Sequence, residues 1–152
     1  MKTVAELINS GIDIKVLYIS LSGFDTHVFQ KNKHKNLLKT YSDGVTALVK
    51  DLKQNNRFED VLIMTFSEFG RRVKQNKSGG TDHGTANNMF VIGKNIKNAG
   101  MQNQLNDLSD LDNFDLKHEI DFRQVYASVL NKWLECDDEI ILGRRFEKMD
   151  FI

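Results

Sequence analysis

The chain has 152 residues, of which 40% are hydrophobic and 28% charged, and its 21 basic residues balance its 21 acidic ones. A formal net charge of zero argues against a general nucleic-acid binder, because contact with a phosphate backbone needs a basic excess. The single cysteine, Cys136, excludes an intrachain disulfide and a cysteine-based zinc cluster. No apolar run approaches the roughly 20 residues that a membrane span needs.

The N-terminal part predicts a short helix and then a buried strand. Thr3-Val4-Ala5-Glu6 has the form of a capping box, and Gly11 is placed to end the helix that it starts. Residues Ile14 to Leu21 are apolar and β-branched without polar alternation, which is typical of a strand buried on both faces. Ser22-Gly23 interrupts this run.

The central part predicts a long helix and two further strands. Apolar residues recur at helical spacing from about His34 to Asn55. Asp60 to Phe66 is predicted to be the second buried strand, and Met89 to Gly93 the third. A strand, a long helix and a strand form a right-handed βαβ unit, so we expect an α/β fold whose sheet is parallel at least in part.

The C-terminal part predicts a loop and one more helix. Residues 95–118 are rich in Asn and Asp, which is typical of a surface loop with one or two helical turns. Asp121 to Gln124 is placed to cap a helix, and the tail from Ile140 to Ile152 is expected to pack on the body. No repeat or linker is visible, so residues 1–152 are predicted to form a single α/β domain.

Acidic and imidazole side chains follow the first two predicted strands and occupy the glycine-rich loop before the third. Asp25 and His27 follow the first strand, Glu68 follows the second, and Asp82 and His83 lie in the loop. Ligands bind beyond the carboxyl ends of parallel strands, so we expect these side chains to converge. Carboxylates with imidazoles suit zinc, manganese or iron better than calcium. Such an ion would polarise a phosphoryl or sulfuryl oxygen, or lower the pKa of a bound water.

Each of these residues also has a structural explanation. Asp25 and Asp82 are placed to start Asx turns, and Glu68 to pair with a neighbouring arginine. Arg71 is a candidate for binding an anion through forked hydrogen bonds, with Ser67 as a nearby hydroxyl donor. No Gly-x-Ser-x-Gly elbow surrounds any hydroxyl residue, which argues against a serine hydrolase.

Five stretches of the chain resemble one known family: GFDTH, HKNLL, VLIMTFSEFGRRV, SGGTDHGTANNMFVIG and DFRQVYASVLNKWL. Together, from about Val16 to Trp133, they are similar to the C-terminal half of the family catalogued as domain of unknown function 1501. That family is grouped with the alkaline-phosphatase-like superfamily of phosphatases, sulfatases and cofactor-independent phosphoglycerate mutases. The resemblance implies a three-layer sandwich with a mostly parallel sheet flanked by helices, and a metal site at the carboxyl ends of its strands.

The resemblance also implies a site for a divalent metal, zinc or manganese, with Asp25, His27 and His83 as ligands and with Glu68 and Asp82 either as further ligands or as residues that orient the ligands. Phe69 stands where the superfamily usually has a histidine ligand, and an aromatic ring cannot ligate. The superfamily's nucleophile lies upstream of the matched stretches, so we expect no catalytic nucleophile in this chain. We expect the chain to be the C-terminal part of a longer alkaline-phosphatase-like domain.

Three functions follow from these observations. The first is a metal-dependent hydrolase-type domain for small phosphate or sulfate esters, catalytically incomplete as this chain. The second is a non-catalytic metal- or anion-binding domain, or a subunit of a larger assembly. The third is a structural α/β fragment whose Asp-His pairs are turns. Missing strands would favour a homo-oligomer or pairing with an N-terminal half. The chain shows no export signal, although longer relatives are often exported to the periplasm, so its compartment stays open.

Overall fold

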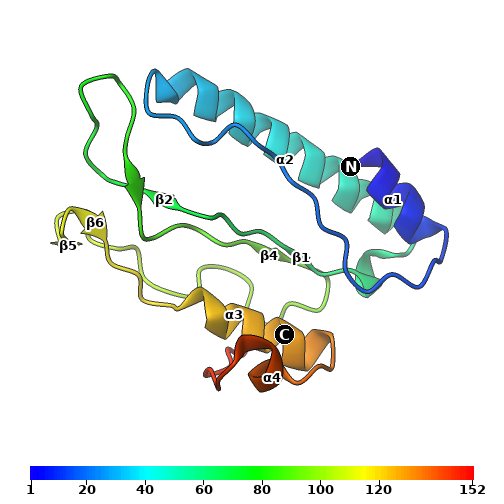
Figure 1. Cartoon of the computed structure of the whole chain (residues 1–152). Coiled ribbons are helices and arrows are strands. Elements are labelled where there is room, and N and C mark those ends of the chain that lie inside the picture. The colour runs from blue at the N-terminus through cyan, green and yellow to red at the C-terminus, as the bar shows by residue number, and fades with distance from the viewer. The chain divides into compact units, whose positions relative to one another are not determined.

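The computed structural model describes all 152 residues. Its helices are α1 (Lys2–Asn9), α2 (Gln30–Gln54), α3 (Phe122–Ser128) and α4 (Asp138–Leu142), with a 3-10 turn at Phe58–Asp60 and a π-helical turn at Val129–Trp133 (Figure 1). Its strands are β1 (Ile63–Met64), β2 (Gly70–Arg71), β3 (His83–Gly84), β4 (Val91–Ile92), β5 (Leu111–Asp112) and β6 (Asp115–Leu116). None of the helices combines the length and the apolar character that crossing a bilayer requires.

The chain forms two compact units, and each is described by itself. Unit 1 contains Met1–Val61 and Arg71–His83, and unit 2 contains Leu62–Gly70 and Gly84–Ile152. The chain therefore passes from one unit to the other at three points. The expectation of a single domain over residues 1–152 stays a prediction.

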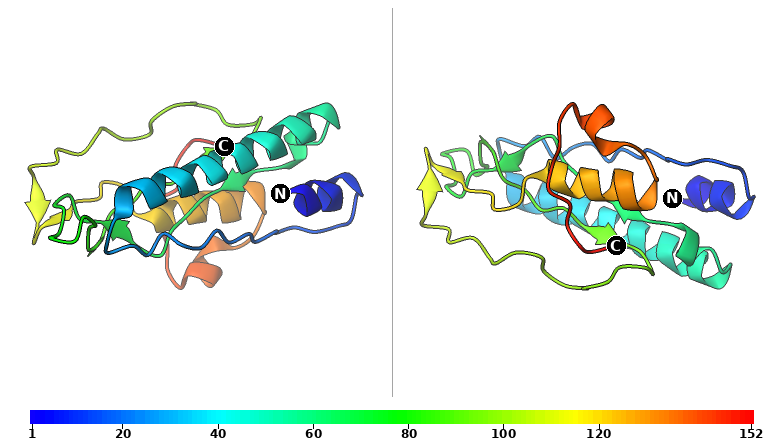
Figure 2. Two further views of the ribbon diagram at one scale, coloured as in Figure 1. Left: turned by 90° about the horizontal axis from the view of Figure 1, so that it is seen from above. Right: turned by 90° about the horizontal axis from the view of Figure 1, so that it is seen from below.

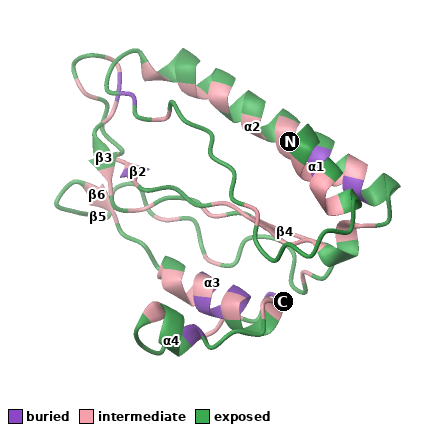
Figure 3. Cartoon of the chain, turned by 45° about the vertical axis from the view of Figure 1, so that its right-hand side comes forward, coloured by how far each residue is buried: buried purple, intermediate pink, exposed green.

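In unit 1, the short helix α1 lies along the C-terminal part of the long helix α2 (Figure 2). The Asn9 side-chain amide at the end of α1 donates to the Asp51 carboxylate of α2 at 2.8 Å. Leu48 and Leu52 are the buried residues of α2, and the rest of this helix is exposed or half-buried (Figure 3). The helical spacing of apolar residues thus predicted α2 correctly, although the helix begins at Gln30, four residues before His34.

Unit 2 has its core on α3. The capping box predicted at Asp121 is confirmed: its carboxylate accepts from the Arg123 N–H at 2.9 Å, and its own N–H donates to the Gln124 side chain at 3.1 Å. One face of α3 and the turn after it then contribute Val125 and Val129 to a buried cluster. Helix α4 packs against α3 as well.

The C-terminal tail completes this core, as predicted. Phe151 lies in the buried cluster with Val125 and Val129. The fully buried Ser128 hydroxyl donates to the Gln124 carbonyl at 2.7 Å and accepts from the Met149 N–H at 2.8 Å. One hydroxyl therefore links the tail to the helix.

The predicted three-layer sandwich with a mostly parallel sheet is wrong. The strands form two-stranded sheets only, in the orders β1–β4, β2–β3 and β5–β6. Strands β1 and β4 are antiparallel, with Ile63 opposite Ile92, and β5 and β6 form an antiparallel hairpin within the predicted 95–118 loop. The predicted strand at Ile14 to Leu21 is an irregular segment that pairs with no strand. An apolar run indicates that a segment can be buried, but a strand also needs a neighbour that satisfies its backbone N–H and C=O groups.

Candidate metal site

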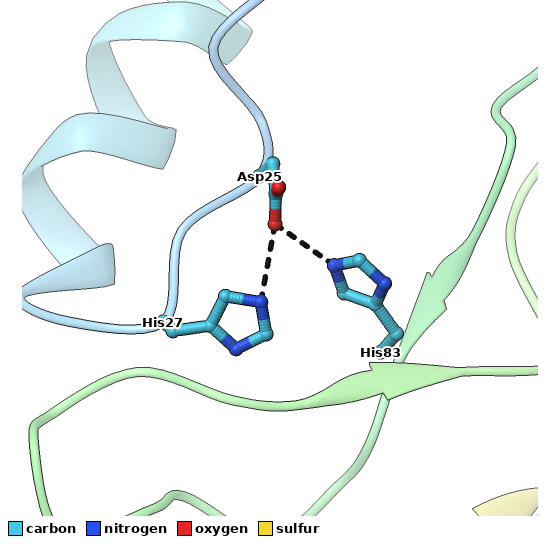
Figure 4. A group of neighbouring side chains, drawn as sticks. All are labelled: Asp25, His27 and His83. Atoms are coloured by element: carbon cyan, nitrogen blue, oxygen red, sulfur yellow. Dashed lines mark hydrogen bonds and ion pairs between the residues drawn. The ribbon is translucent and has the colours of Figure 1, made fainter.

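Unit 1 brings Asp25, His27 and His83 together (Figure 4). Asp25 and His27 lie in the segment that precedes α2, and His83 belongs to β3. One carboxylate oxygen of Asp25, Oδ1, lies 2.8 Å from His83 Nε2 and 3.1 Å from His27 Nε2. One ligand atom from each of the three residues lies within 4.8 Å of the others, so a single metal ion could contact all three.

The second carboxylate, Asp82, lies on the other side of the His27 ring. Its Oδ1 is 3.6 Å from His27 Nδ1, while His27 Nε2 faces Asp25. The 3.6 Å between Asp82 Oδ1 and His27 Nδ1 is an ion-pair distance and is too long for a hydrogen bond. An imidazole that ligates a metal through one nitrogen commonly presents its other N–H to a carboxylate, which fixes the ring. Asp82 therefore faces the His27 nitrogen that points away from Asp25, at a distance from which a small side-chain movement would form this hydrogen bond.

Two backbone loops meet at this site because a glycine allows it. Val28 forms an antiparallel bridge with Gly79, and the Gln30 N–H donates to the Gly79 carbonyl at 3.0 Å. At Gly80, an added Cβ would lie 2.4 Å from the carbonyl carbon and oxygen of His27. No side chain fits in that space, so the glycine-rich sequence is needed for the close approach.

Asn76 holds the same two loops and was not predicted as a site residue. Its side-chain N–H donates to the His27 carbonyl at 2.9 Å. Its side-chain oxygen accepts from the N–H groups of Ser78 at 2.9 Å and Gly80 at 3.0 Å. Asparagine ahead of a Ser-Gly-Gly sequence is typical of an Asx turn, and this signal could have identified it.

The electrostatics of the cluster favour an ionised Asp25. The hydrogen bond from His83 holds the pKa of the Asp25 carboxyl below its usual value, aided by the charges of His83, His27 and Arg71 and opposed by desolvation. The cluster is open to solvent, since the side chain of Asp25 is 66% exposed and that of His83 is 44% exposed. An ionised and accessible carboxylate is the form that binds a metal ion.

Arg71 lies beside Asp25 in the same unit. Its Nη2 is 3.9 Å from Asp25 Oδ1, and its guanidinium donates hydrogen bonds to the carbonyl groups of Phe24 and Thr81. The anion binding predicted for Arg71 and Ser67 stays a prediction. Ser67 belongs to unit 2, where its hydroxyl donates to the Phe69 carbonyl at 2.9 Å.

Thr26 and His34 form a pair that resembles a nucleophile with its base. Thr26 Oγ1 lies 2.8 Å from His34 Nε2, a distance at which a base can activate a hydroxyl. The same Nε2 lies 3.1 Å from the Phe24 carbonyl oxygen, which can only accept a hydrogen bond. In the tautomer that donates to this carbonyl, the proton is on Nε2, and this nitrogen cannot take the proton of Thr26. Thr26 is also buried, and the pair therefore holds the loop together.

Four of the five predicted metal-site residues thus lie in one cluster: Asp25, His27, Asp82 and His83. Glu68, the fifth, belongs to unit 2, and its role as a ligand stays a prediction.

The comparison with protein families identifies the class to which the chain belongs. Residues 6–143 match the family described as "Protein of unknown function (DUF1501)", so the chain is a member of that family. No curated protein and no solved structure matches the chain. The finer assignments, to the C-terminal half of the family and to the alkaline-phosphatase-like superfamily, stay predictions.

Proposed function

We propose that this chain is a metal-binding domain in which Asp25, His27 and His83 hold one divalent transition-metal ion. The observation that supports this proposal is the placement of both histidine Nε2 atoms at 2.8 Å and 3.1 Å from one oxygen of Asp25. In a tetrahedral zinc site with bonds of about 2.0–2.1 Å, ligand atoms lie roughly 3.3 Å apart. The carboxylate oxygen lies somewhat closer to each imidazole nitrogen than this, so the three side chains would have to move apart slightly to admit the ion.

The donor atoms decide which metals are suitable. Two imidazole nitrogens and one carboxylate oxygen suit zinc, manganese or iron(II), whereas calcium prefers oxygen ligands alone. We propose zinc or manganese as the cofactor. Three protein ligands leave at least one coordination position open, as in catalytic zinc sites. The solvent exposure of Asp25 and His83 leaves that position accessible.

Hydrolysis of phosphate or sulfate esters is the catalytic function that this site favours. The carboxylates of Asp25 and Asp82 and the guanidinium of Arg71 together carry one negative charge. A divalent ion would give the centre a net positive charge, which attracts an anionic ester. The ion would supply Lewis-acid polarisation of the ester oxygen or a hydroxide at neutral pH. A binding domain without turnover is the alternative, since unit 1 presents no activated nucleophile at Thr26.

The test is metal content after equilibration with zinc or with manganese, followed by removal of free metal. Wild type and the control His118→Ala, whose histidine is exposed in unit 2, should each retain one ion per chain. His83→Ala should retain none. Equal retention in wild type and His83→Ala would contradict the site.

The loaded proteins are then assayed with nitrophenyl phosphate and nitrophenyl sulfate. Turnover that requires both the metal and His83 would support the hydrolase. Metal binding without turnover would support the non-catalytic binding domain.

A further inference from the structure

Arg71 joins the two loops that carry the proposed metal-site residues. Its Nη2 donates to the Phe24 carbonyl at 2.5 Å, and its Nη1 donates to the Thr81 carbonyl at 2.6 Å. Each of these carbonyls belongs to the residue immediately before a site carboxylate, Asp25 in one loop and Asp82 in the other. The guanidinium is planar and rigid, so two hydrogen bonds from it fix the separation of the two carbonyl groups.

The Phe24 carbonyl is held from a second direction. His34, in the first part of α2, places Nε2 3.1 Å from the same oxygen. The loop before Asp25 is thus attached both to α2 and, through Arg71, to the loop before Asp82. Only 18% of the Arg71 side chain is exposed, and hydrogen bonds shielded from water are electrostatically stronger.

We propose that Arg71 is a positioning residue for the metal site, whose guanidinium sets the distance between the Asp25–His27 loop and the Asp82–His83 loop. This inference rests on the proposed metal site. Arg71 acts through the backbone, because its Nη2 is 3.9 Å from Asp25 and too far away to donate a hydrogen bond to that carboxylate. Arg71 sets this distance through the two hydrogen bonds that its planar guanidinium donates, and not through its positive charge.

Two substitutions separate the effect of the paired hydrogen bonds from the effect of the positive charge. Arg71→Lys keeps the positive charge but presents a single ammonium group, which cannot span the Phe24 and Thr81 carbonyls as a rigid fork does. Arg71→Ala removes both charge and fork. Arg57→Ala is the matched control, because Arg57 lies in the same unit and pairs with Asp60 at 3.0 Å.

The experiment measures cobalt(II) affinity from the visible absorption of the bound ion, which also reports its coordination geometry. We expect the Kd to rise about 10- to 100-fold in both Arg71→Lys and Arg71→Ala, the range typical for loss of a residue that orients metal ligands. Arg57→Ala should bind as wild type does. Addition of methylguanidinium to Arg71→Ala should recover the affinity and the spectrum of wild type, which a general loss of stability would not allow.

Amide hydrogen exchange of the metal-free proteins gives a second readout. The N–H groups of Phe29 and Gln30 donate across the two loops, to the carbonyls of Ser78 at 3.1 Å and Gly79 at 3.0 Å. Their exchange should be faster in both Arg71 variants than in wild type and in Arg57→Ala.

Each outcome has a separate meaning. Wild-type cobalt affinity in Arg71→Lys would overturn the positioning role while leaving the metal site intact. An equal loss in Arg57→Ala would overturn it as well, because the effect would then be one of general stability. Absence of cobalt binding in wild type would instead overturn the metal site itself, and the inference with it.

Discussion

At the scale of single residues, Gly80 shows how the absence of a side chain sets the geometry of the site. Gly80→Ala would place a methyl group 2.4 Å from the His27 carbonyl, so the two loops would have to move apart. We expect a loss of about 1–3 kcal/mol in the free energy of unfolding, the cost typical of overpacking, together with weaker zinc binding. Urea unfolding and zinc titration calorimetry measure the two effects.

Gly44→Ala in α2 is the control for this substitution. Its new methyl group would meet only the flexible Met1 side chain, at 3.3 Å, and alanine is the better helix former. Gly44→Ala should therefore keep or raise stability and leave zinc binding unchanged. If Gly80→Ala behaved in the same way, the close approach of the loops would not matter for the site.

Asp121 supports a prediction about pH. The hydrogen bond from the Arg123 side chain lowers the pKa of the Asp121 carboxyl from 3.8 to about 2. Because the pKa is lower in the folded state, the ionised carboxylate stabilises the fold above about pH 4, and this contribution is lost as the pH falls toward 2. Asp121→Ala should cost about 1 kcal/mol at neutral pH, as is typical of a helix N-cap. A difference between wild type and variant that stayed constant from about pH 5 to pH 2 in urea unfolding would contradict this.

At the scale of elements, the packing of α2 depends on few buried residues. Leu52 is 0% exposed, and Leu52→Ala should lower the free energy of unfolding by about 2–5 kcal/mol through lost burial and the cavity left behind. Leu38, on the same helix, is 55% exposed, and Leu38→Ala should change stability by about 0.5 kcal/mol or less. Similar losses in the two variants, measured by urea unfolding, would mean that α2 is not anchored through Leu52.

Two helix predictions hold because their signals are local, whereas the capping box expected between Thr3 and Glu6 is wrong, since α1 begins at Lys2 without a side-chain cap. The apolar spacing of α2 and the Asp121–Gln124 capping box depend on residues three or four positions apart, and the structure confirms both. Strand pairing depends on distant segments, and here the prediction was wrong. Ile63–Met64 pairs with Val91–Ile92 in antiparallel register, and not with the apolar run that begins at Ile14.

The sequence indicated which residues belong to the candidate metal site, but it did not indicate how the fold brings them together. Adjacent carboxylates and imidazoles in glycine-rich loops indicated the chemistry, and four of the five residues lie together in unit 1. The expected reason for their convergence, the carboxyl ends of parallel strands, does not hold in this structure. Gly80 instead allows the loops to approach, and Asn76 and Arg71 hold them through hydrogen bonds to backbone carbonyls. These contacts join residues far apart in the chain and leave no periodic signal in the sequence.

At the scale of the whole molecule, the proposed metal site would link zinc binding to stability. Asp25 and His83 are 58 residues apart in the sequence, so an unfolded chain rarely brings their ligand atoms together. Zinc should therefore bind the folded state far better than the unfolded state. At a free zinc concentration of about 100 times the Kd, the free energy of unfolding should rise by about 2.7 kcal/mol.

Thermal unfolding at increasing zinc concentration measures this linkage, with chelator added to reverse it. The Tm of wild type should rise with the logarithm of free zinc once that concentration exceeds the Kd, whereas the Tm of His83→Ala should stay constant. His83→Ala also removes the hydrogen bond to Asp25, so its Tm without metal serves as its own baseline. An equal rise in Tm in both proteins would mean that zinc binds elsewhere in the chain. No rise in either protein would mean that zinc does not bind the folded state in preference to the unfolded state. Only a rise that depends on His83 is consistent with a site assembled by folding from the two loops of unit 1.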